Sequence, residues 1–161
     1  MSLVLRELTA ADLAAVSGWF ADPATARWLG GAAWARRLLE LAAASPGRFA
    51  LAAVRGDALV GLADVERFGD GRAAVAIVVA PDARRSGVAT AMVRALGAHL
   101  ALAGIAEVVA GVEAGNAASE ALVRAAGFER VTEAPDADGF VYFARRTDGA
   151  RPACPWALPL G

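Results

Sequence analysis

Apolar and polar residues alternate along the chain in patterns that predict short strands and amphipathic helices. The clearest strand covers residues 74–79, an uninterrupted apolar run rich in β-branched residues, which predicts a strand buried on both faces. Pro81 ends this strand because proline cannot donate to a neighbouring strand. Apolar residues then recur at helical spacing and predict a helix that stops before Gly104. The recurring residues are Val88, Met92, Leu96 and Leu100.

Before this unit, the pattern predicts a strand, several helices and a β-hairpin. Thr9 is a suitable N-cap for the first helix, and Gly56-Asp57 is typical of the tight turn of a hairpin. The predicted elements are a strand over residues 3–8, a helix over 10–20, a short helical piece over 25–29, a helix over 32–44, and strands over 49–55 and 58–68. Three tryptophans in the helical part either pack in the core or line a substrate groove. They are Trp19, Trp28 and Trp34.

After the long helix, the pattern predicts a buried strand, a helix and two final strands. Asn116 is suited to cap this helix and Gly127 to end it in the left-handed conformation. The elements cover residues 107–112, 117–126, 128–131 and 140–144. The expected apolar contacts of the helix are Ala118, Ala121, Leu122 and Ala125.

Prolines mark the end of the ordered region. Pro152, Pro155 and Pro159 exclude regular structure there. We therefore expect one domain over residues 1–147 and a tail over residues 148–161. The tail either docks through Trp156 and Leu158 on a surface or a second subunit, or it is a loosely held terminus.

Composition limits the classes of protein to which the chain can belong. Its 161 residues, 57% of them hydrophobic, suffice for one domain with a sizeable core. The net charge of −1 creates no overall field, so we expect neither nucleic acid nor a membrane as a partner. Cys154 is the only cysteine, which is compatible with a reducing cytoplasm. The first residues lack the layout of a signal peptide, and a cytoplasmic location is expected.

A basic turn separates the apolar strand from the long helix. The first amides of a helix have no partner within it and favour an anion. Gly87 and Ala89 are small enough for an anion to approach the backbone, and Arg84 and Arg85 add positive charge. This combination predicts a phosphate site, while the alternative is an ordinary connection with solvated arginines. The turn has neither the Walker lysine nor the third glycine of a dinucleotide fingerprint.

Two segments resemble the GNAT superfamily of N-acetyltransferases. Residues 79–89 resemble its acetyl-CoA-binding segment, whose pattern of Arg or Gln, two residues, Gly, one residue, and Gly or Ala is met by Arg84, Gly87 and Ala89. Residues 116–119, followed by Gly127-Phe128, resemble the branch that includes ribosomal-protein N-terminal acetyltransferases. The resemblance covers roughly residues 3–146, and both motifs occur in the expected order.

The resemblance implies a fold and a cosubstrate. It implies a single-domain α/β (α+β) fold, with a mixed, mostly antiparallel sheet of about seven strands that is splayed at its central strands and has helices on both faces. The cosubstrate would be acetyl-CoA, with no metal. By resemblance, its pyrophosphate and pantetheine would be bound by Ile77, Val78, Val79, Arg84, Arg85, Ser86, Gly87, Val88, Ala89, Thr90, Asn116 and Ser119.

The common general acid of the family is absent here. Many members have a tyrosine in the late helix, where this chain has Leu122, Val123 and Arg124. Tyr142, the only tyrosine, falls on a late strand. Ser119 is then the candidate to donate a hydrogen bond to the departing sulfur.

The common general base is also absent. Many members have a glutamate on the central strand, where this chain has Ala74, Ala76 and Val78. The remaining candidates are Glu66, Asp64 and Glu113, acting directly or through a water; each could instead be a surface or strand-end charge. A site without a strong base favours a weakly basic amine such as an α-amine.

These observations lead to one main hypothesis and one alternative. The main one is an N-acetyltransferase that moves an acetyl group from acetyl-CoA to a primary amine of a peptide, protein or small molecule, by direct attack in a ternary complex. Such a protein would be a monomer or a homodimer. The alternative is a non-catalytic acyl-CoA-binding module or regulator with the same fold, suggested by the missing acid and base.

Overall fold

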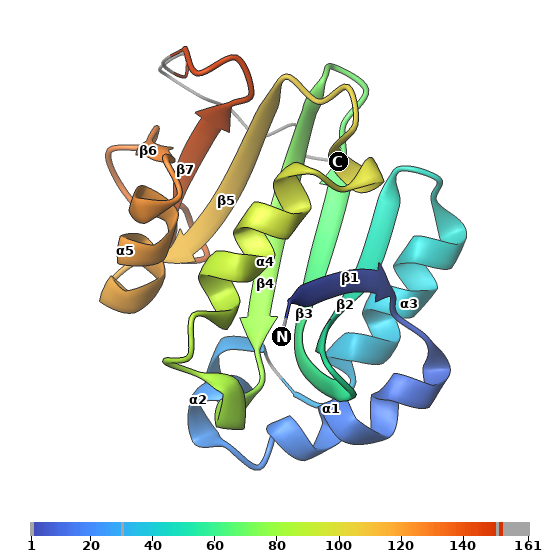
Figure 1. The fold of residues 1–161 in the computed structure, drawn as a ribbon. Helices are drawn as coiled ribbons and strands as arrows, with labels where there is room; N and C mark the ends of the chain where they lie inside the picture. Colours follow the sequence, from blue (N-terminus) through green and yellow to red (C-terminus); the bar gives the residue numbers. More distant parts are fainter. Residues whose placement is uncertain (1, 30, 151, 153–161) are drawn as a thin grey trace.

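A single mixed sheet forms the centre of the molecule (Figure 1). The computed structural model describes residues 2–29, 31–150 and 152. Within them, seven strands are arranged in the order β1-β2-β3-β4-β5-β7-β6. Their bounds are β1 Leu3–Glu7, β2 Arg48–Arg55, β3 Ala58–Arg67, β4 Arg72–Val79, β5 Glu107–Glu113, β6 Glu129–Arg130 and β7 Phe140–Arg146. Every neighbouring pair is antiparallel except β4 and β5, so the predicted α/β (α+β) fold with a mostly antiparallel sheet is confirmed.

Helices cover both faces of the sheet, and each face has its own core. The helices are α1 Leu13–Trp19, α2 Pro23–Leu29, α3 Trp34–Ala44, α4 Val88–Gly97 and α5 Ala117–Ala125. Leu51 and Ala53 of β2 face the core under α4 and α5, which contains Met92. Ala50 and Ala52, the alternate residues of the same strand, face the core under α1 and α3. The side chains of a strand alternate between its faces, so β2 contributes to both cores.

The long helix is shorter than its apolar spacing predicted. It ends at Gly97, and His99 is extended, with a φ of −83° and a ψ of 147°. The His99 Nδ1 atom accepts a hydrogen bond from the Ala101 backbone N–H at 3.0 Å and caps a separate 3-10 turn, η3 Leu100–Leu102. Leu100 is therefore 82% exposed instead of continuing the buried stripe, so its predicted place on that stripe was wrong.

The inward face of α5 also differs from the prediction. Ala118, Ala121 and Ala125 are exposed, whereas Val123 is buried in the core and Leu122 is partly buried. A helix so rich in alanine has no strong apolar stripe, and packing of the larger residues decides which side faces inward. The predicted helix ends are confirmed, because the Asn116 side chain caps the first turn and Gly127 has a φ of +89°.

Some sequence expectations fall outside the part of the chain that the structure describes. The side chain of Trp28 and residues 153–161, with Cys154, Trp156 and Leu158, lie outside it. The predicted tail and its boundary after Thr147 therefore stay predictions. Of the described helices, none combines the length and the apolar character that crossing a membrane requires.

Candidate active site

The sheet opens between its two parallel strands. β4 pairs with β5 only from Arg72–Glu107 to Val75–Ala110, while its other edge pairs with β3 as far as Val79. Beyond Val75 the two strands diverge toward their carboxyl ends, as their arrowheads show in Figure 1. The predicted splay at the central strands is therefore present. It also explains why β4 is less buried than predicted, with Ala76 exposed.

Two residues of β4 direct their backbone groups into this gap. The Ala80 N–H donates to the Val60 carbonyl at 2.9 Å, so Ala80 is bonded to the β3 side. In an antiparallel ladder, alternate residues bond to the same neighbour. Val78 therefore also bonds to β3, and the N–H and C=O groups of Ile77 and Val79 point toward β5, where pairing has ended. They can bond an extended ligand as a neighbouring strand would.

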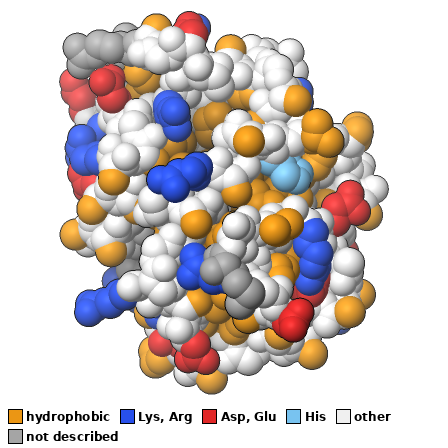
Figure 2. Space-filling view, viewed as in Figure 1, with side chains coloured by type: hydrophobic (Ala, Val, Ile, Leu, Met, Phe, Trp, Pro, Cys, Tyr) orange, Lys and Arg blue, Asp and Glu red, His pale blue; other side chains and the backbone are white. Residues whose placement is uncertain are grey.

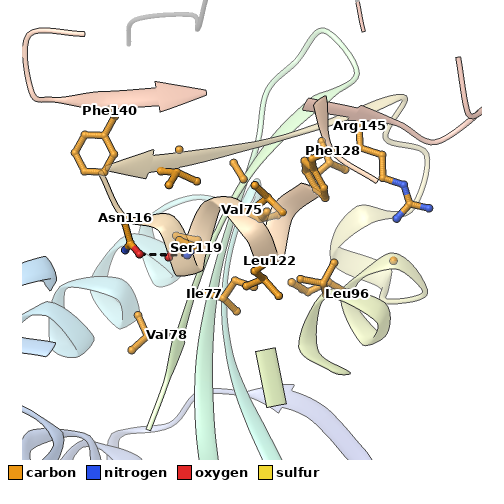
Figure 3. Close-up of a pocket in the computed structure, with 18 of the residues that line it drawn as sticks. Val75, Ile77, Val78, Leu96, Asn116, Ser119, Leu122, Phe128, Phe140 and Arg145 are labelled. Atoms are coloured by element: carbon orange, nitrogen blue, oxygen red, sulfur yellow. Dashed lines mark hydrogen bonds between the residues drawn. The ribbon is translucent and has the colours of Figure 1, made fainter. Parts of the chain in front are cut away.

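A cavity of about 350 Å³ occupies the gap and continues beneath α5 (Figure 3). Its walls come from β4, β5, α4 and α5 and are mainly apolar. Asn116 and Ser119 lie at one end of the cavity in Figure 3, and Glu113 also lines the cavity. Leu96, Phe128 and the exposed Arg145 lie at the other end, with Ile77 and Leu122 between the two ends in Figure 3.

A second cavity, of about 330 Å³, adjoins the first and extends to α2. Both cavities are lined by Ile77, Val78, Asn116 and Ser119, so these four residues lie at the junction. The second cavity is otherwise lined by Ala24, Thr25, Val79 and Arg84. A ligand reaching the junction through the gap would thus meet a second ligand arriving from the α2 side.

The basic turn leads from β4 into the N-terminus of α4. Gly87 is the N-cap of α4 with a φ of +76°, and a Cβ built on it would meet nothing within 4 Å. The amides of Val88, Ala89 and Thr90 open the helix, and intrahelical bonding does not reach these first positions. Backbone amides without a partner in the helix, open space beside Gly87 and the positive helix end satisfy the requirements of an anion site.

Other residues of the turn shape it and add charge. Arg85 is exposed and has a φ of +60°, the one non-glycine residue with a positive φ in the described part of the chain. The Ser86 hydroxyl donates to the Ala83 carbonyl at 2.5 Å. Arg55 of β2 donates to the Ser86 carbonyl at 3.4 Å and connects the turn to the sheet.

The side chain of Arg84 connects the turn to α2. Its Nη1 donates to the Asp22 carboxylate at 2.9 Å, and its Nη2 donates to the Thr25 hydroxyl oxygen at 2.7 Å. The Thr25 hydroxyl, 2% exposed as a residue, donates in turn to Asp22 at 3.0 Å. Bonds from the Thr25 backbone N–H, its hydroxyl and Arg84 lower the pKa of Asp22. Arg84 lines the second cavity while holding α2 against the turn, a contact that the sequence did not predict.

Asn116 combines a capping role with a place in the site. Its Oδ1 atom accepts a hydrogen bond from the Ser119 backbone N–H at 3.2 Å, shown dashed in Figure 3. This bond uses the side-chain oxygen of Asn116 and leaves its NH₂ group as a donor. The Ser119 hydroxyl has no part in it. The predicted pair is therefore brought together at the junction of the two cavities.

The three candidate carboxylates lie in different places. Glu113, at the end of β5, lines the first cavity. Asp64 and Glu66 lie on β3 and line neither cavity. Arg48 binds Asp64 through two hydrogen bonds of 2.8 and 2.7 Å, and its Nη1 lies 3.4 Å from Glu66. Glu113 is therefore the one of the three that the fold brings to the site.

Tyr142 is bound elsewhere. Its hydroxyl donates to the Asp136 carboxylate at 2.7 Å, and the residue lines neither cavity. Burial, followed by the bond to Asp136, raises the pKa of Tyr142 to about 12. The phenol is thus protonated at neutral pH, held by Asp136 and absent from the lining of both cavities, so it does not replace the tyrosine that the late helix lacks.

Residues 2–129 match the family model of an acetyltransferase (GNAT) domain. The chain belongs to the GNAT acetyltransferase family, as the two sequence motifs predicted. Membership in this family also confirms acetyl-CoA as the predicted cosubstrate. No curated protein sequence matches the chain.

Solved structures share the fold at low sequence identity. An aminoglycoside acetyltransferase, AAC(6')-Ib in complex with coenzyme A, is 20% identical with a TM-score of 0.77, over 92% of this chain and 96% of that one. An acetyltransferase from Thermus thermophilus is 20% identical, with a TM-score of 0.77 over 91% and 97%. A ribosomal-protein-alanine N-acetyltransferase from Brucella melitensis is 25% identical, with a TM-score of 0.68 over 89% and 99%.

Proposed function

We propose that the protein is an N-acetyltransferase that moves the acetyl group of acetyl-CoA to a primary amine by direct attack in a ternary complex. The observation that carries this proposal is the opening of the sheet beside the basic turn. Ile77 and Val79 direct unpaired backbone groups into this gap, where Ile77 lines both cavities, Val79 lines the second, and the two cavities meet at Asn116 and Ser119. The first cavity, the donor cavity, suits the donor arm, and the second cavity suits the acceptor.

The donor site consists of two parts with different chemistry. Backbone amides from Gly87 to Thr90 would bind the pyrophosphate, with Arg85 and Ser86 at its edge and Arg84 as the link to α2. The strand edge from Ile77 to Val79 would bond the pantetheine amides in the manner of a β-strand. The two parts follow each other along one continuous segment of chain, from β4 through the turn into α4.

Attack by the amine forms a bond from nitrogen to the carbonyl carbon and breaks the carbon–sulfur bond. The sulfur keeps the electron pair, and the positively charged nitrogen loses a proton. We assign Ser119 the role of donating a hydrogen bond to this sulfur, with the NH₂ group of Asn116 beside it. Glu113 is the proposed acceptor of the proton, directly or through a water, because it lines the donor cavity.

Replacing Ser119 with alanine is expected to lower kcat about 10- to 100-fold, because a hydrogen bond to a charged group contributes about 1.5–3 kcal/mol. The Asn116 cap would persist, since it uses the Ser119 backbone N–H and not the hydroxyl. The KM for acetyl-CoA should change little. Kinetics of thiol release measure both constants, and Ser17→Ala, an exposed serine on α1, is the control. An unchanged kcat in Ser119→Ala would contradict the assigned role.

The acceptor is proposed to be a weakly basic amine, with an α-amine as the first choice. A lysine amine has a pKa of about 10.4 and an α-amine about 7.8, so deprotonation at pH 7 costs about 4.6 and about 1 kcal/mol respectively. Glu113 is the one carboxylate among the residues that line the two cavities, so the site favours the amine with the smaller cost of deprotonation. The acceptor would approach through the second cavity, between α2 and Ser119. Trp19 and Trp34 pack in the core under α1 and α3, which supports the core interpretation for these two.

The proposal is tested by incubating the protein with acetyl-CoA and a panel of peptides with free N-termini, lysine-containing peptides with blocked N-termini, polyamines and aminoglycosides. Release of free thiol that depends on the acceptor, and fastest with an α-amine, is the expected result. Binding of acetyl-CoA with no acceptor-dependent release across the panel would favour the non-catalytic binding module. The residues Leu122 and Ala74, where an acid and a base are common in the family, are the observation behind that alternative.

A further inference from the structure

The donor cavity continues well past the residues that the proposed reaction uses. The junction with the acceptor side lies at Asn116 and Ser119, yet the cavity extends beneath α5 to Leu96 of α4 and Phe128 after α5 (Figure 3). Val108 of β5 and Leu102 add further apolar side chains to the lining of this cavity. An acetyl group at the junction would fill only a small fraction of about 350 Å³.

The inner part offers few polar groups to a ligand. The Thr147 hydroxyl lines it but already donates to the Ile105 carbonyl at 3.0 Å. Arg145 also lines it, but the residue is exposed, and in Figure 3 its guanidinium points away from the cavity. The pantetheine amides would bond at the junction of the two cavities, where Ile77 presents its backbone groups, and along Val79 on the side of the second cavity. The polar pantetheine arm therefore fits the part of the cavity near Asn116 and Ser119, and an apolar acyl chain fits the inner part beneath α5.

From this geometry we infer that the protein accepts acyl donors with an aliphatic chain longer than acetyl, and that the chain occupies the inner cavity beneath α5. This inference rests on the proposed function and specifies its donor. An apolar cavity of about 150 Å³ holds the six carbons of benzene. A cavity of about 350 Å³ therefore has room for a six-carbon chain together with part of the pantetheine arm.

The expected preference follows from burial of methylene groups. Each methylene transferred from water to an apolar wall improves affinity by up to about fourfold. Hexanoyl-CoA has four more carbons than acetyl-CoA and should bind at least about tenfold more tightly, after ordering of the chain is allowed for. Transfer would follow the same course, with the amine nitrogen bonding to the acyl carbon, the carbon–sulfur bond breaking, and a proton leaving the nitrogen.

The test is the affinity of the intact protein for CoA, acetyl-CoA, butanoyl-CoA, hexanoyl-CoA and octanoyl-CoA, measured by titration calorimetry. Affinity should rise from acetyl-CoA to hexanoyl-CoA. Equal affinities, or a decrease with chain length, would overturn the inference. If CoA itself does not bind, the proposed donor site is wrong. If CoA binds without any preference for chain length, the proposed function stands and only this inference fails.

Leu122→Trp places a large side chain in the middle of the cavity and should reduce the ratio of hexanoyl-CoA to acetyl-CoA affinity to about one. Ala121→Trp is the matched control, because Ala121 is the adjacent residue of α5, is exposed and does not line the cavity. Its ratio should equal that of the unmodified protein. Equal ratios in the two variants would contradict the inference. Should Leu122→Trp not fold, Val93→Phe narrows the same cavity from α4 and gives the same comparison.

Discussion

Replacing Gly87 with valine is expected to reduce affinity for coenzyme A at least about 100-fold. Gly87 has a φ of +76°, a conformation in which a β-branched residue is strained by about 1–3 kcal/mol. A shift of the N-cap would move the amides of Val88, Ala89 and Thr90 away from the pyrophosphate. In addition, the valine side chain would enter space that is open in the structure and that the phosphate oxygens need. Titration calorimetry with coenzyme A measures the loss.

Gly104→Val is the matched control for this variant. Gly104 has a φ of +74°, and a Cβ built there also meets nothing within 4 Å. It lies after η3, past the opposite end of α4 from the basic turn. Both variants should lose similar stability on thermal unfolding, but only Gly87→Val should lose affinity for the ligand. Unchanged affinity in Gly87→Val would refute the assignment of the turn as the pyrophosphate site.

Replacing Gly61 with alanine should lower the free energy of unfolding by about 3 kcal/mol, the upper part of the range for overpacked cores. A Cβ at Gly61 would lie 2.6 Å from the Met92 Sδ atom and 2.8 Å from the Val78 carbonyl oxygen. The methionine end is flexible and could move. The carbonyl cannot move freely, because Val78 is held in the ladder with Leu62 of β3. Urea denaturation measures the change.

Gly18→Ala is the control for this second prediction. Gly18 lies in α1, and a Cβ built on it meets nothing within 4 Å. Alanine is a better helix former than glycine, so this variant should gain about 1 kcal/mol. The free energy of unfolding is expected to fall in Gly61→Ala and to rise in Gly18→Ala. A stable Gly61→Ala variant would show that α4 does not pack this closely on β3 and would question the position of the turn at its N-terminus.

The parts of the site that could be predicted from the sequence are those held by neighbours along the chain. The strand of residues 72–79, the turn and the start of α4 follow one another, so their order alone places a glycine-containing turn at a helix N-terminus. The Asn116 cap likewise depends only on Ser119, three residues ahead. The end of α4 could not be predicted in this way. A histidine can follow a helix or begin a turn, and the extended backbone of His99 in the structure shows that a turn begins there.

Contacts between distant segments could not be predicted. Arg84 and Asp22 are 62 residues apart, and nothing in the basic turn indicates that its first arginine would be bound by α2. Glu66 and Glu113 look equivalent as carboxylates at strand ends. Only the pairing of β3 with β2 brings Arg48 to Glu66, and only the opening of the sheet places Glu113 beside the cavity.

Patterns within the sequence sufficed to predict the family and most of the secondary structure, because hydrophobic period, caps and turns are local properties of the chain. Tertiary structure alone decided where β4 and β5 separate, how far the cavity extends beneath α5, and which charged groups reach it. Those features depend on the pairing register of strands and on the packing of helices far apart in the sequence, and such long-range contacts leave no periodic pattern in either segment.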